Sequence, residues 1–219
     1  MATWSASTTE VSQWGAPPTV APAAAIFLHG RARSPQDVLA LAARISLPSL
    51  ACLAPAAPEG SWYPQSFLAP RAQNQPWLDR ALARVEALVG ALGRLGHAPE
   101  RLALVGFSQG ACLAAEYVLR HPRRWGALIA FTGGLIGPPG LRWPAGGDLV
   151  GTPVLLATAD PDAWVPVSRV RETAEVFRAM GATVDERVYP GLEHAVNDEE
   201  IEAARALLAP LVTVPAASR

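Results

Sequence analysis

Short apolar runs alternate with longer segments of helical periodicity along most of the chain. The apolar or alternating runs predict six β-strands, most of them ended by glycine or proline. These strands are AAIFLHG (24–30), LACLAPAAP (50–58), RLALVGF (101–107), WGALIAFTGG (125–134), TPVLLATAD (152–160) and TVDERVYPG (183–191). Apolar residues at helical spacing predict five helices, over 34–45, 77–96, 109–122, 167–181 and 198–211. Strands separated by helices, most of them uniformly apolar, predict an α/β fold with a mostly parallel sheet covered on both faces.

The pattern predicts one α/β domain over residues 23–219. Residues 1–22 are rich in Ala, Ser, Thr and Pro without periodicity, which is typical of a flexible N-terminal extension. Trp4 and Trp14 lie in this segment, and one of them is expected to dock on the domain, because tryptophan is costly to leave in water.

Composition and charge limit the kinds of molecule that this protein is expected to bind. Half of the 219 residues are hydrophobic and the net charge is −1 with no basic run, so neither nucleic acid nor an anionic membrane is an expected partner. No apolar stretch approaches the roughly 18 residues of a membrane span, and the N-terminus is unlike a signal peptide. Two cysteines, Cys52 and Cys112, lack metal-ligand spacing and are expected to be free. We therefore expect a reduced cytoplasmic protein without stable membrane insertion.

One serine lies where a strand is predicted to become a helix. Ser108 is the centre of Gly106-Phe107-Ser108-Gln109-Gly110, which matches G-x-S-x-G. A tight strand-to-helix turn leaves no room for side chains two residues before and after its centre, so glycine is needed there. The alternative is an ordinary helix-capping serine, but the flanking strand and helix favour a nucleophile at the carboxyl edge of the sheet.

Among the four histidines, His194 is the expected general base. It lies after Ser108 in a loop that follows a predicted strand, as this chain order of nucleophile and base requires. We expect His121 to cap the end of its helix, His97 to be solvated, and His29 to support its turn by hydrogen bonds rather than transfer protons. The acid that orients the base should come from ATADPDAWVPV, where spacing alone leaves Asp160 and Asp162 as alternatives.

An oxyanion hole requires two backbone N–H groups aimed at the developing negative charge. One should be the N–H of Gln109, which directly follows the nucleophile. The other is expected in the turn after the first predicted strand, where Gly30 lets the backbone bend and the N–H of Arg31 is best placed. We expect the Arg31 side chain to be a solvated charge or a contact to an anionic substrate.

Four segments together resemble one family. FLHGRARSPQD, GFSQGACLAAEY, DAWVP and YPGLEHAVNDEEI are similar to the phospholipase/carboxylesterase branch of the α/β-hydrolase fold, which includes the acyl-protein thioesterases. The resemblance covers about residues 24–210. It implies Ser108, Asp162 and His194 as the catalytic triad, because the D-x-x-V-P match selects Asp162 over Asp160. It also places Arg31 and Gln109 where the family has its oxyanion-hole amides, and it implies no cofactor or metal.

The chain departs from this family in two loops. The usual L-H-G-x-G-D sequence is here Leu28-His29-Gly30-Arg31-Ala32-Arg33, and the loop GSWYPQSFLAP is aromatic. Both differences disfavour long acyl-protein substrates. We expect substrate contacts from Trp62, Tyr63 and Phe67 of this loop, and from Leu135 and Trp164 in later loops. The alternative is that the aromatic residues form a small core that holds the loop, and the sequence leaves the two open.

The expected function is that of a serine carboxylesterase acting on small to medium esters through an acyl-enzyme. One alternative keeps the triad but changes the bond, as in a thioesterase or a lactone hydrolase of dienelactone type; serine rather than cysteine at position 108 disfavours the lactonase. Another alternative is a non-catalytic binding protein on a hydrolase fold, which predicts a broken triad. The expected partner is a small-molecule ester, and a homodimer is left open.

Overall fold

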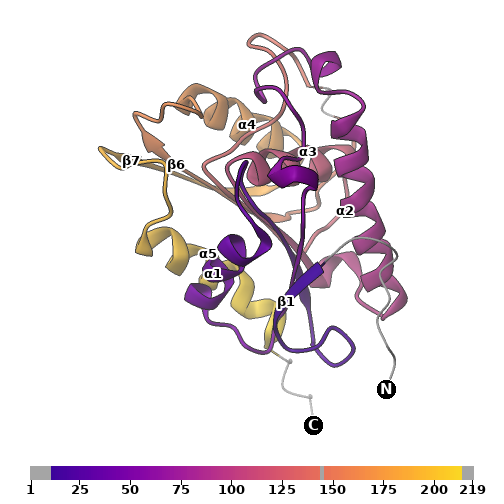
Figure 1. The fold of residues 1–219 in the computed structure, drawn as a ribbon. Coiled ribbons are helices and arrows are strands. Elements are labelled where there is room, and N and C mark those ends of the chain that lie inside the picture. Colours follow the sequence, from indigo (N-terminus) through magenta and orange to yellow (C-terminus); the bar gives the residue numbers. More distant parts are fainter. Residues whose placement is uncertain (1–10, 144–145, 214–219) are drawn as a thin grey trace.

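A computed structural model describes residues 11–143 and 146–213. Seven strands form one sheet, with helices on both faces (Figure 1). The strands are β1 (Val11–Gly15), β2 (Ala24–Leu28), β3 (Ala51–Pro55), β4 (Leu102–Phe107), β5 (Ala127–Phe131), β6 (Pro153–Asp160) and β7 (Thr183–Pro190). The helices are α1 (Pro35–Ile45), α2 (Trp77–Arg94), α3 (Gln109–Arg120), α4 (Val167–Ala179) and α5 (Asp198–Val212). All six predicted strands and all five predicted helices are present, and the α/β prediction is confirmed.

The strand order reverses direction between β2 and β4. The order is β1-β3-β2-β4-β5-β6-β7, and every pair is parallel except β1 with β3. After β2 the chain adds β3 on one side, and it then returns to place β4 on the other side. The carboxyl ends of β2 and β4 therefore lie next to each other, with Leu28 opposite Gly106. Such a reversal is where open α/β sheets bind their ligands.

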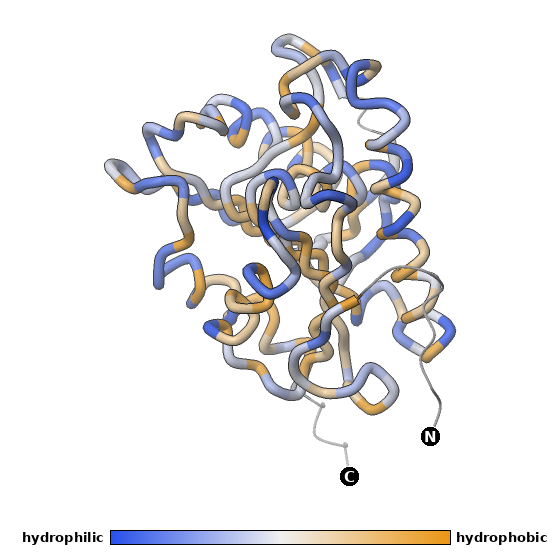
Figure 2. The backbone as a smooth tube through the Cα atoms, viewed as in Figure 1, coloured by the Kyte–Doolittle hydropathy of each residue, from blue (hydrophilic) through white to orange (hydrophobic). Residues whose placement is uncertain are grey.

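Each face of the sheet has its own core. Helices α1 and α5 cover one face, and α2, α3 and α4 cover the other (Figure 1). The central strands are hydrophobic along their length, whereas the outer helices alternate in polarity (Figure 2). The two cysteines are free and buried in different cores, Cys112 with α3 and Cys52 facing α1 and α5. Within the described residues, no helix is long and apolar enough to cross a membrane.

The prediction that residues 1–22 form a flexible extension is wrong for residues 11–22. Residues 11–15 form β1, an edge strand paired antiparallel with β3, and Trp14 packs on the core beneath α1 and α5. The following loop is also held, because the Nε2 N–H of His97 donates to the carbonyl oxygen of Pro18 at 2.7 Å. His97 is therefore buried rather than solvated. The rest of the predicted extension, including Trp4, lies outside the described residues.

Candidate active site

Ser108 occupies a sharp turn between β4 and α3. Its backbone has φ 54° and ψ −118°, outside the regions that side-chain-bearing residues normally adopt. A Cβ atom at Gly106 would collide with the backbone of Gly110, and one at Gly110 would collide with the carbonyl group of Leu28. The two glycines thus allow α3 to cross close behind β2 and β4. The Ser108 N–H donates to the carbonyl of Phe131 on β5 at 2.9 Å, which anchors the turn in the sheet.

A chain of hydrogen bonds joins three side chains from three separate loops. The Oγ atom of Ser108 lies 2.9 Å from Nε2 of His194, and Nδ1 of His194 lies 2.7 Å from Oδ2 of Asp162. A carboxylate accepts hydrogen bonds only, so Nδ1 carries the proton that points at Asp162. In the neutral imidazole Nε2 then has a free lone pair, and it accepts the hydroxyl proton of Ser108. The arrangement is that of a nucleophile, a base and an acid that orients the base.

The Asp162 carboxylate is fully buried, and both of its oxygens have partners. Oδ2 faces His194, while Oδ1 accepts the backbone N–H groups of Trp164 and Val165 at 2.8 and 2.9 Å. These bonds fix the carboxylate and compensate its burial without competing for the imidazole. Asp160, the other candidate in the sequence, ends β6 with an exposed side chain, and its backbone carbonyl accepts the N–H of Gly191 at the start of the His194 loop.

The two expected oxyanion-hole residues flank Ser108. Gln109 is the first residue of α3, where N–H groups have no partner within the helix and the helix dipole is positive. The turn after β2 passes beside the serine, since a Cβ on Gly30 would lie 3.4 Å from Cβ of Ser108. Among the backbone hydrogen bonds of the described residues, neither Arg31 nor Gln109 donates its N–H to another carbonyl. The lack of a backbone acceptor is consistent with the expected oxyanion-hole role, which stays a prediction.

His29 supports the turn after β2, as predicted. Its Nδ1–H donates to the carbonyl of Gly30 at 2.8 Å, and its Nε2 accepts the N–H of Ala57 at 3.0 Å. This pair of bonds requires the neutral ring, and burial lowers the pKa of His29 in the same sense. The Trp62 indole donates to the carbonyl of His29 at 2.8 Å, so the turn is also joined to the loop after β3.

The side chains of Gln109 and Arg31 hold the loop after β3, a function that the sequence did not predict. The Gln109 amide accepts the N–H of Trp62 at 2.9 Å and donates to the carbonyl of Tyr63 at 2.8 Å. Arg31 donates to the carbonyls of Pro64 and Gln65 at 2.7 and 2.6 Å. The Arg31 guanidinium is thus neither an unattached surface charge nor directed at a substrate in this structure. It fastens the aromatic loop to the turn beside Ser108.

The five residues expected to contact substrate fall into two groups. Trp62, Tyr63, Phe67 and Leu135 are each at most 8% exposed and belong to the core that covers one face of the sheet. Trp164 is 71% exposed and follows Asp162 by two residues. The four buried side chains thus pack as structural support for the loops around Ser108. A contact between any of these residues and substrate stays a prediction.

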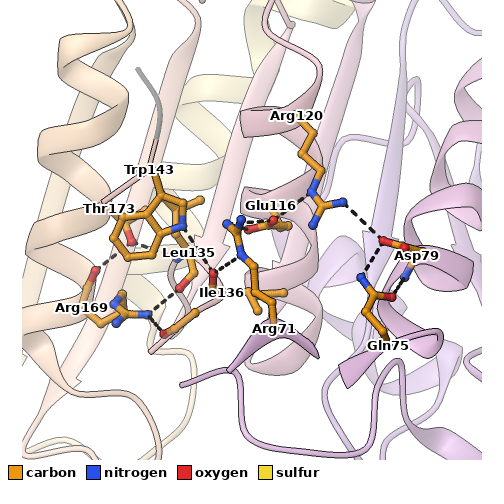
Figure 3. A network of polar contacts seen from close by, with 11 residues as sticks. Arg71, Gln75, Asp79, Glu116, Arg120, Leu135, Ile136, Trp143, Arg169 and Thr173 are labelled. Carbon is orange, nitrogen blue, oxygen red and sulfur yellow. Dashed lines mark hydrogen bonds and ion pairs between the residues drawn. The ribbon is translucent and has the colours of Figure 1, made fainter. Parts of the chain in front are cut away.

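Buried charged side chains hold the loop after β5 (Figure 3). This network was not predicted from the sequence. Glu116 on α3 is fully buried and binds Arg71 at 3.1 Å and Arg120 at 2.9 Å. Arg71 also donates to the carbonyl of Ile136 at 3.0 Å. Arg169 on α4 is 3% exposed and donates to the carbonyls of Leu135 and Gly137 at 2.8 and 2.7 Å. One indication of this network was present in the sequence, because Glu116 is the only charged residue in the apolar helix sequence GACLAAEYVL.

The residues in the described ranges form no cluster of three or more histidine, cysteine, aspartate or glutamate side chains able to hold a metal ion.

Comparisons with known proteins agree on one family. A family model described as phospholipase/carboxylesterase matches residues 15–211. The crystal structure of a phospholipase/carboxylesterase from Dyadobacter fermentans DSM 18053 is 41% identical with a TM-score of 0.88, and the match covers 92% of this chain and 97% of that one.

Two further relatives match in sequence over shorter stretches. A probable carboxylesterase, SOBER1-like, from Arabidopsis thaliana is 27% identical over 130 residues, 59% of this chain and 50% of the relative. Acyl-protein thioesterase 1 from Gibberella zeae is 29% identical over 120 residues, 52% of this chain and 49% of the relative. The matches thus span about half the length of these two relatives. Because the family model covers most of the described sheet and helices, the chain belongs to the phospholipase/carboxylesterase family and has the α/β-hydrolase fold.

Proposed function

We propose that this protein is a serine hydrolase that cleaves small to medium carboxylic esters through an acyl-enzyme. The observation that carries the proposal is the unbroken hydrogen-bonded chain from Ser108 through His194 to the buried Asp162. A serine hydroxyl is a weak nucleophile by itself, and an adjacent imidazole that accepts its proton makes it reactive at neutral pH. A non-catalytic protein on this fold would have no need of three side chains aligned in this way.

The reaction proceeds in two halves. Ser108 Oγ bonds to the ester carbonyl carbon while its proton passes to Nε2 of His194, and the carbonyl oxygen becomes an oxyanion. The intermediate then collapses, the bond to the alcohol oxygen breaks, and Nε2 returns its proton to the departing alcohol. A water molecule next attacks the acyl-serine and gives a proton to His194. When the second intermediate collapses, the acid leaves and Ser108 regains its proton.

The surroundings stabilise each charge that develops. The Asp162 carboxylate stabilises the imidazolium that forms at His194 and keeps the proton of the resting ring on Nδ1. The N–H groups of Arg31 and Gln109 donate to the oxyanion, and loss of one such donor typically costs about 10²–10³ in kcat. All proton transfers use side chains and water of the site.

The loops around Ser108 favour a compact substrate. The aromatic loop after β3 is fastened by Gln109 and Arg31, and we propose that Trp62, Tyr63, Phe67 and Leu135 form the packed wall of the site while Trp164 contacts the substrate from its rim. An uncharged ester with an aryl or short acyl group fits such walls best. The same triad would also cleave a thioester, so rates on esters and thioesters of matched acyl length determine which bond the enzyme prefers.

Substitution of the nucleophile tests the proposal. We expect Ser108→Ala to lower hydrolysis of p-nitrophenyl acetate by at least about 10³-fold, and to abolish labelling by a fluorophosphonate probe, because both require the activated hydroxyl. The matched control is Ser49→Ala, an exposed serine that precedes β3 at the opposite edge of the sheet. Substantial hydrolysis by a folded Ser108→Ala protein would remove Ser108 from the mechanism, and an unlabelled wild type would refute the proposed hydrolase.

A further inference from the structure

The loop that carries His194 lies at the surface with little packing of its own. Of residues 191–195 only His194 is even partly buried, and the other four are exposed. The loop is tied at its start, where the Gly191 N–H donates to the carbonyl of Asp160 at 2.8 Å. The imidazole must nevertheless stay within hydrogen-bond distance of both Ser108 and Asp162, so the far end of the loop also needs an anchor.

Arg44, on the last turn of α1, provides that anchor. Its Nη1 donates to the carbonyl of Val196 at 3.1 Å, and its Nη2 donates to Oδ1 of Asp198 at 2.8 Å. Val196 lies two residues after His194, and Asp198 is the first residue of α5. One planar guanidinium therefore joins the end of the loop to the start of the helix, and its rigid fork sets their separation.

Arg44 is itself held in place by α5. Arg205 donates from Nε to the carbonyl of Ile45 at 2.6 Å and from Nη2 to the carbonyl of Arg44 at 2.8 Å. These carbonyls end α1, where no further helical N–H reaches them. Helices α1 and α5 lie side by side on one face of the sheet (Figure 1), and each binds the end of the other through an arginine.

We propose that Arg44 is a positioning residue for His194, acting through the Val196 carbonyl and α5 to keep the imidazole aligned between Ser108 and Asp162. The proposal rests on the proposed hydrolase mechanism. Asp198 is 98% exposed, so its ion pair with Arg44 adds little to the stability of the fold. The contribution of Arg44 is geometric, because small displacements of a reacting group reduce the rate of chemistry much more than they reduce binding.

Kinetics of Arg44 variants separate positioning from structure. For Arg44→Ala we expect kcat on p-nitrophenyl acetate to fall about tenfold with KM little changed, because Arg44 acts only through His194. Arg44→Lys keeps the charge, but its single nitrogen cannot copy the two-point fork, so its kcat should also fall. Asp198→Asn leaves the Val196 bond intact and should have a smaller effect. The control is Arg80→Ala, an exposed arginine on α2.

A proton NMR measurement tests the same inference without turnover. The proton between Nδ1 of His194 and Asp162 should give a low-field resonance, assigned by its loss in His194→Gln. We expect this resonance to broaden and exchange faster with water in Arg44→Ala and Arg44→Lys, and to be unchanged in Arg80→Ala. An Arg44→Ala protein with wild-type kcat and an unchanged resonance would overturn the inference, as would full rescue by lysine. If the wild type shows the resonance but hydrolyses no ester, the proposed function fails, and the resonance of the variants still decides the role of Arg44.

Discussion

Ser108 shows how a single residue is constrained by its neighbours. A side chain held at φ 54° and ψ −118° costs roughly 1–3 kcal/mol, and it persists because the surrounding structure leaves no alternative. The glycines at 106 and 110 are the sequence signature of that constraint, which is why the sharp turn and its serine could be predicted. The bonds from the Gln109 side chain to the loop after β3 have no such signature in the sequence, because a glutamine in the first turn of a helix is equally stable in water.

Glu200 should make stability depend on pH. Its side chain is 2% exposed, and Oε1 has no hydrogen-bond partner among the described residues. Burial raises the pKa of Glu200 to about 7, although the Asn197 N–H and the Arg44 charge favour ionisation. The folded protein therefore holds this proton more tightly than the unfolded chain, so the contribution to stability is present below about pH 4.5 and is lost as the pH rises through about 7.

Glu200→Gln removes this titration and keeps an oxygen to accept the Asn197 N–H. We expect the variant to be more stable than the wild type by roughly 2–3 kcal/mol at pH 8, with the difference disappearing near pH 4.5. Urea unfolding across this pH range measures the difference, with exposed Glu199→Gln as the control. A free-energy difference that does not change with pH would contradict a buried, titrating Glu200.

At the scale of elements, prediction succeeded where a hydrophobic pattern was long or uniform. The central strands and all five helices bury continuous apolar faces, so their sequences repeat the period of the structure. Strand β1 was missed because five residues with the sequence VSQWG at a sheet edge need little apolar material. The anchors of the loops after β3 and β5 were missed because Gln109 and the arginine side chains bind backbone groups that are distant in sequence, and only Glu116, a charge within an apolar helix, gave a local signal.

The buried carboxylate of α3 should be important for stability. Glu116 is fully buried between Arg71 and Arg120, and Glu116→Gln would remove the negative partner of Arg71 and leave Arg120 with only the exposed carboxylate of Asp79. We expect this substitution to lower the free energy of unfolding by about 2–4 kcal/mol. The matched control, Asp185→Asn, breaks an ion pair with Arg187 in which both side chains are more than a third exposed, and it should cost under about 1 kcal/mol. Equal losses in urea unfolding would show that burial of the ion pair is not what matters.

At the scale of the whole molecule, the sheet brings together residues that are far apart in sequence. The loops after β4, β6 and β7 meet at one edge because parallel strands all end there. The same architecture separates other residues completely. Cys52 and Cys112 lie in the cores of opposite faces, and burial raises the pKa of each thiol to about 12.

Thiol reagents should therefore leave the native protein intact. At pH 8 we expect neither cysteine to react with dithiobisnitrobenzoate and ester hydrolysis to be unaffected, because the thiolate is the reactive form and both thiols are buried. The same protein unfolded in guanidinium chloride should react at both cysteines, which provides the control. Loss of activity on modification of the folded protein would point to a cysteine at the reacting centre instead of Ser108.

The sequence by itself determined the α/β class, the order of the main elements, the serine turn and the histidine, because each leaves a local pattern of apolar periodicity or glycine spacing. It also suggested Asp162, but only through resemblance to a family. Tertiary structure alone decided that Asp162 rather than Asp160 reaches His194, that β1 completes the sheet, and that arginines hold the surrounding loops. These features depend on side chains meeting across the fold, and such distances are not encoded in the pattern of any one segment.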